Sequence, residues 1–86
     1  MTDPERFNAI RLVAAEVASE VSQAMNKFPA FHSAHEGWAF LKEEVDELWD
    51  EVKKKRKIRD HEKLRYEAIQ CAAMAIQFVI DCEGDK

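Results

Sequence analysis

Six acidic residues fall within residues 43–51, the stretch of this sequence best suited to chemistry. On a helix that turns by about 100° per residue, Glu44, Glu47 and Glu51 lie along one flank of the apolar stripe. The other three acids lie on the opposite side, where solvated charge is ordinary. Carboxylates that border a core favour a compensating cation when further carboxylates lie nearby.

A second polar feature lies on the helix expected over residues 60–82. Its polar residues share one narrow face of an otherwise apolar cylinder: Lys63, Glu67, Gln70, Gln77 and Asp81. If this helix lies antiparallel to the preceding one, Glu44 and Glu47 face Glu67. Converging carboxylates resist ionisation in a low dielectric unless a cation compensates them. Mg²⁺ is commonly shared between carboxylates and substrate phosphates, so the pattern indicates phosphate chemistry.

The same residues have a structural interpretation that needs no ligand. Acid-rich amphipathic helices often expose glutamates at i,i+3 and i,i+4 spacing as a solvated face. A buried row of Glu and Gln side chains can also form hydrogen bonds across an oligomer interface. Spacing alone leaves both interpretations open.

Three helices must position these side chains. The first is expected from Asp3, as N-cap with Pro4 at the first helical position, to about Lys27. The second begins at the capping box of residues 33–36, continues to Val52 and ends in the basic run 53–57. The third starts at Asp60 as N-cap and runs to about Cys82, with a short connection at residues 58–59.

Composition favours an all-α chain of one domain, residues 1–86. Two Gly and two Pro are too few for the turns of a sandwich or barrel. We expect a three-helix chain with a long helical hairpin that assembles into an oligomeric helical bundle. The third helix is apolar on more sides than two partner helices can cover, and it should be the most buried.

The overall charge limits the partners. The chain carries 13 Lys plus Arg against 17 Asp plus Glu, a net charge of −4, so we do not expect nucleic acid as a partner. No apolar run approaches the length of a membrane span, and the N-terminus lacks the pattern of a signal peptide, so we expect a cytoplasmic protein without a membrane partner. Cys71 and Cys82 lie roughly 16 Å apart along one helix, beyond disulfide reach.

Residues 43–47 read Glu-Glu-Val-Asp-Glu and match EExxE, and residues 67–70 read Glu-Ala-Ile-Gln about twenty residues later. This pairing resembles the signature of the MazG-like all-alpha nucleoside triphosphate pyrophosphohydrolases, which is EExxE on one helix and ExxD on the next. The resemblance covers roughly residues 5–82. It implies hydrolysis of a nucleoside triphosphate to the monophosphate and pyrophosphate, with Mg²⁺ or alternatively Mn²⁺, in a fold that dimerisation or higher assembly completes.

The resemblance also implies roles for individual residues. Glu44, Glu47 and Glu67 correspond to metal ligands, and Glu43 and Glu47 to catalytic carboxylates. Glu43 would act as a supporting carboxylate or as a base that orients water. Gln70 stands where the family has aspartate; it offers a metal an oxygen but no charge, so ion affinity should fall. This departure favours the alternative function, a catalytically silent helical interaction or regulatory module.

Four further residues are candidates for binding a nucleoside triphosphate. Lys54, within the basic run, is expected to hold the terminal phosphates, and Lys27 and Lys42 offer the same from other helix edges. Trp38 is placed to stack on a base. The structural alternatives are a solvated helix end for the lysines and a core role for the aromatic ring. The expected assembly is a homodimer or homotetramer.

Overall fold

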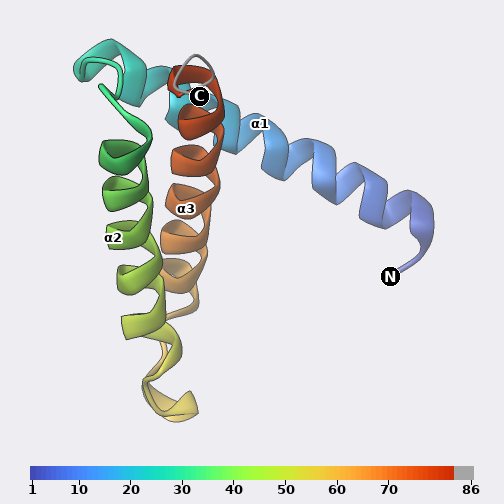
Figure 1. Cartoon of the computed structure of the whole chain (residues 1–86). Coiled ribbons are helices and arrows are strands. Elements are labelled where there is room, and N and C mark those ends of the chain that lie inside the picture. The colour runs from blue at the N-terminus through green and yellow to red at the C-terminus, as the bar shows by residue number, and fades with distance from the viewer. Residues whose placement is uncertain (83–86) are drawn as a thin grey trace.

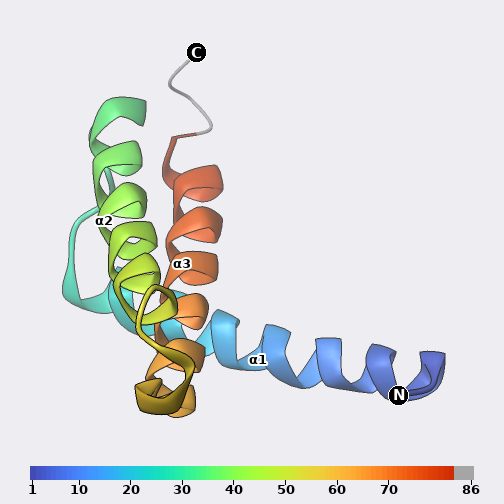
Figure 2. The ribbon, with the colours of Figure 1, turned by 90° about the horizontal axis from the view of Figure 1, so that it is seen from below.

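The computed structural model describes residues 1–82, which form three α-helices and one short 3₁₀ helix. The helices are α1 (Asp3–Lys27), α2 (Ala34–Val52), η1 (Arg56–Ile58) and α3 (His61–Asp81). The described part of the chain holds no strand, which confirms the all-α prediction. Helices α2 and α3 run side by side in opposite directions, while α1 crosses them and its N-terminal half projects away (Figures 1 and 2).

The start of α1 differs from the prediction by one residue. Thr2, not Asp3, is the N-cap, and its Oγ1 accepts a hydrogen bond of 3.3 Å from the backbone N–H of Glu5. Asp3 and Pro4 are therefore the first two helical residues. The shift is physically reasonable because a threonine hydroxyl caps well and Asp3 then lies in the first turn, where a negative charge suits the helix dipole.

The predicted caps of the other two helices are confirmed. Ser33 Oγ accepts from the Glu36 N–H at 3.1 Å, and Asp60 accepts from the N–H groups of Glu62 and Lys63. The capping box at Ser33 is only half formed, because the Glu36 carboxylate accepts from the backbone N–H of His32. The Glu36 carboxylate therefore connects the loop before α2 to the first turn of the helix.

The connection between α2 and α3 is longer than expected. Helix α2 ends at Val52, so the basic residues 53–57 form a turn and part of η1 instead of continuing the helix. Arg59 stabilises this turn, because its guanidinium donates to the carbonyl oxygens of Val52 and Lys54 at 2.7–3.0 Å. These bonds satisfy carbonyl groups that the end of α2 leaves without partners.

The core of the chain is small. Its buried apolar cluster lies between α1 and α3 and consists of Val17, Val21, Ile69 and Ala73. Helix α3 contributes four buried residues, more than α1 or α2, as its composition predicts. One side of it is nevertheless uncovered, with Val79 67% and Ile80 51% exposed.

None of the described helices is long and apolar enough to cross a membrane.

Helix α2 meets α3 through its acidic flank, not through the centre of its apolar stripe. Trp38 and Val45, which belong to the predicted stripe, are 54% and 45% exposed. Glu44 is half-buried, and Glu51 is buried. The helices pack closely at Gly37, where an added Cβ would lie 2.7 Å from Phe78 Cδ2. The lack of a side chain at Gly37 thus lets α2 approach α3 on this side.

We predict that Gly37→Ala destabilises the protein, although alanine normally favours helix by up to about 1 kcal/mol. The new methyl group would meet Phe78, Cys82 and Phe31 at 2.7–3.1 Å, and such overpacking costs about 1–3 kcal/mol. Urea unfolding measures the change in the free energy of unfolding. An increase in stability would show that the contact at Gly37 is not tight.

Candidate metal centre

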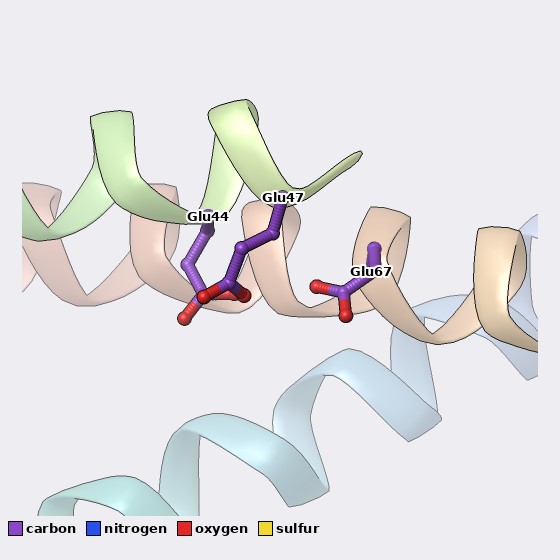
Figure 3. A group of neighbouring side chains, drawn as sticks. All are labelled: Glu44, Glu47 and Glu67. Atoms are coloured by element: carbon purple, nitrogen blue, oxygen red, sulfur yellow. The ribbon is translucent and has the colours of Figure 1, made fainter. Parts of the chain in front are cut away.

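Three glutamates converge between α2 and α3. Glu44 and Glu47 lie one turn apart on α2, and Glu67 reaches them from α3 (Figure 3). One carboxylate oxygen of each lies within 4.8 Å of the others. The helical spacing predicts this convergence, because i and i+3 share a helix face and the neighbouring helix runs antiparallel. We call these three residues the carboxylate cluster.

Glu67 is the most buried member of the carboxylate cluster. Its exposed fraction is 8%, and its Oε2 is buried with no hydrogen-bond partner among the described residues. Glu44 is half-buried and Glu47 is exposed, so the cluster opens toward solvent on one side. An unpartnered buried carboxylate oxygen is unfavourable unless a proton or a cation compensates it.

The cluster shifts the pKa values of its own members. Burial, followed by the charges of Glu47 and Glu67, raises the pKa of Glu44 to about 7. The pKa of Glu67 is also raised, by burial first and then by Glu47, although Lys63 acts in the opposite direction. The thiol of Cys71 is affected as well, because burial and the nearby carboxylates raise its pKa. Burial and mutual repulsion therefore both favour the protonated forms of Glu44 and Glu67.

Glu51 shows what a compensated carboxylate looks like on the same helix flank. It is 5% exposed, and its oxygens lie 2.9 Å from Lys54 Nζ and 3.5 Å from Lys63 Nζ. The hydrogen bond from Lys54 lowers the pKa of Glu51 despite its burial. Glu51 thus takes part in structural ion pairs with Lys54 and Lys63. The carboxylate cluster, one turn away, has no comparable cation among the described residues.

The donor set of the cluster suits a hard divalent ion. Three carboxylates supply oxygen ligands, and Oε2 of Glu67 is a buried acceptor without a hydrogen-bond partner among the described residues. Mg²⁺ prefers such ligands and completes its shell with water or phosphate oxygens, and Mn²⁺ has similar preferences. The residues present therefore fit the ion that the sequence resemblance implies.

Gln70, the expected fourth ligand, is engaged elsewhere. Its Nε2 donates a 3.0 Å hydrogen bond to Glu20 Oε2 on α1. Sequence reasoning missed Glu20, although it lies on the flank of the α1 apolar stripe beside Val21. Coordination of a metal by the amide oxygen of Gln70 stays a prediction.

A cavity of about 420 Å³ adjoins the carboxylate cluster, and Glu44 belongs to both. Four of the residues that line it are aromatic, namely Phe28, Phe31, Phe40 and Tyr66. Phe31 and Phe40 stack on each other with ring centroids 5.4 Å apart. Gln70 and Lys27 also line this cavity. Phe40 and Tyr66 escaped the sequence analysis because their helical positions resemble those of ordinary surface aromatics.

The other predicted site residues lie apart from this cavity. Lys42 forms an exposed ion pair of 2.8 Å with Asp46, and Lys54 pairs with Glu51. Trp38 is exposed on the far side of the α2 stripe from the acidic flank. Glu43 is exposed and adds to the charge that raises the pKa of Glu44. The structure thus joins Lys27 to the cavity but leaves Trp38, Lys42 and Lys54 outside its lining.

No family model, curated protein or solved structure matches this chain.

We predict that Glu44→Gln changes the pH dependence of stability. The pKa of Glu44 is raised from 4.5 to about 7 in the folded protein. The protonated side chain therefore contributes its full stabilisation below pH 4.5, the ordinary pKa, and this contribution is lost as the pH rises through about 7. Glutamine cannot ionise, so the stability of Glu44→Gln relative to wild type should increase from pH 4.5 to pH 8.

Urea unfolding in a chelated buffer across this range measures the effect. Asp46→Asn is the matched control, because Asp46 is exposed on the same helix and pairs with Lys42. If wild type and Glu44→Gln keep a constant stability difference over the range, Glu44 is not electrostatically strained.

Proposed function

We propose that this protein is a Mg²⁺-dependent nucleoside triphosphate pyrophosphohydrolase. It would convert an NTP or dNTP and water into the monophosphate and pyrophosphate. The observation that carries the proposal is the buried, unpartnered Glu67 Oε2 within a cluster of three carboxylates from two helices. The resemblance of residues 43–47 and 67–70 to the MazG-like signature supports the same function.

The cluster and the cavity provide complementary halves of a nucleotide site. Glu44, Glu47 and Glu67 would hold the ion, and Mg²⁺ supplies positive charge to the phosphate oxygens when bound. The cavity of about 420 Å³ falls in the range of roughly 300–1,000 Å³ typical of small-molecule sites, and its aromatic wall suits a stacked base. Because Glu44 borders both, a base in the cavity would have its phosphates near the carboxylates.

The remaining roles follow from position. By the MazG-like resemblance, Glu43 would orient the water that attacks the α-phosphorus and accept its proton, although it is exposed and lies across the helix from the carboxylate cluster. The bond between the α-phosphorus and the bridging oxygen then breaks, and pyrophosphate leaves. Lys27 lines the cavity and offers a positive charge to the phosphates. Lys42 and Lys54 would have to leave Asp46 and Glu51 to do the same.

The second candidate is a catalytically silent helical interaction or regulatory module with the same fold. Gln70 favours it, because this residue brings no negative charge and its amide bonds to Glu20. In this alternative, protons neutralise the carboxylate cluster, which agrees with the raised pKa values of Glu44 and Glu67.

For either function we propose a homodimer or homotetramer. Large apolar side chains on α2 and α3 are uncovered in the single chain, including Trp38, Trp49 and Val79. A cytoplasmic location stays a prediction.

Metal binding is the first test. If the cluster binds Mg²⁺ or Mn²⁺ only in the folded state, saturating ion should raise the melting temperature. At an ion concentration of 100 times Kd, the free energy of unfolding should increase by about 2.7 kcal/mol. Glu67→Gln should lose this shift, and Gln70→Asp should increase it. NaCl at matched ionic strength is the control. Equal shifts in wild type and Glu67→Gln would place the ion elsewhere.

Turnover is the second test. We expect pyrophosphate release from a panel of NTPs and dNTPs with Mg²⁺, reduced at least about 100-fold in Glu47→Gln because a charged ligand is lost. Asp50→Asn, a change on the solvent side of the same helix, should retain wild-type rates. Absence of turnover in wild type with gain in Gln70→Asp would favour the silent module.

A further inference from the structure

The first half of α1, residues 3–16, has no buried side chain. We call this segment the α1 arm. It projects from the body of the chain as a single helix (Figures 1 and 2). Glu16 forms an ion pair with Arg65 of α3, and beyond it the next buried residues are Val17 and Val21. The arm is therefore held to the chain only at its C-terminal end.

The arm carries the same apolar face that α1 uses to pack on α3. Phe7, Ile10 and Val13 continue the row of Val17 and Val21 at steps of three and four. These three side chains are 68%, 61% and 41% exposed. Most helical stability in proteins comes from packing of an amphipathic face, and the apolar face of the arm is unpacked among the described residues.

The matching face of α3 is also uncovered past the same contact. Ile76 and Ile80 continue the row of Ile69 and Ala73, again at steps of three and four, and are 42% and 51% exposed. Both apolar rows that meet in the core thus extend beyond it, in different directions. Each chain offers one uncovered row on α1 and one on α3.

The dimensions of the chain indicate how much surface lacks a partner. Its radius of gyration is 14.7 Å, against about 12 Å for a compact domain of this length. Its accessible surface is 6787 Å², roughly 1,500 Å² more than a compact monomer of this mass exposes. A standard interface buries about 800 Å² per partner, so the excess is enough for a stable dimer.

We propose that two copies of this chain exchange arms. The Phe7–Val13 row of one copy packs on the Ile76–Ile80 row of α3 in its partner, and the reverse contact forms by two-fold symmetry. A second copy is the occupant because the chain carries both halves of the interface, and a symmetric pair covers both at once. This inference rests on the proposed self-association but not on the nucleotide chemistry.

The test is the molar mass of the full chain by size-exclusion chromatography with light scattering. Wild type should have twice the 10.0 kDa chain mass or a higher even multiple. Ile10→Arg should lower the mass at the same concentration. Leu12→Arg is the matched control, because Leu12 is 62% exposed, like Ile10, but lies on the opposite side of the arm. Ile80→Arg tests the receiving face and should resemble Ile10→Arg.

A single-chain mass for wild type, or equal effects of Ile10→Arg and Leu12→Arg, would overturn the proposal. An unchanged mass in Ile80→Arg would overturn the receiving face. Hydrogen exchange on wild type gives an answer even if a variant fails to fold. Protection of the residue 3–16 amides should fall as dilution dissociates the dimer; protection that does not change on dissociation contradicts the exchange. Because the readouts are mass and protection, loss of pyrophosphate release alone leaves the result unaffected.

Discussion

Glu67 lies buried at the contact of α2 with α3, where no hydrogen-bond donor among the described residues reaches its Oε2. The two helices could pack without burying an unpartnered carboxylate oxygen if α2 presented the centre of its apolar stripe. Instead, close packing at Gly37 brings the acidic flank of α2 against α3. This rotation of α2 about its axis turns Glu44 and Glu47 toward Glu67. The raised pKa values of Glu44 and Glu67 follow from it.

Three acidic side chains at the α2–α3 contact, Glu44, Glu51 and Glu67, have different electrostatic surroundings. Glu51 is neutralised within the chain by Lys54 and Lys63, and its pKa is lowered. Glu44 and Glu67 have raised pKa values and no comparable partner. A chain optimised for stability alone would place a cation or an apolar residue there. This arrangement lies next to the cavity, and the proposed function rests on that proximity.

The rotation that forms the cluster also leaves apolar surface uncovered. Trp38 and Val45 are turned away from α3, and the α1 arm lies beyond the core. The buried apolar cluster contains four residues, which is little for a chain of this length. Self-association would therefore serve stability, and the proposed site and the proposed assembly would depend on the same packing geometry.

The three helices, the caps at Ser33 and Asp60, and the shared helix face of Glu44 and Glu47 could be predicted from the sequence. These features depend on local capping chemistry and on the 3.6-residue period, which one chain segment specifies. The convergence with Glu67 was predicted only on the assumption that the two helices lie antiparallel. Packing between the helices determines that Glu67 meets Glu44 and Glu47 and that Glu51 pairs with Lys63. It also determines that Gln70 bonds to Glu20 and that Trp38 faces solvent. The rotation and crossing of helices depend on side-chain packing between distant segments, and periodicity does not encode it.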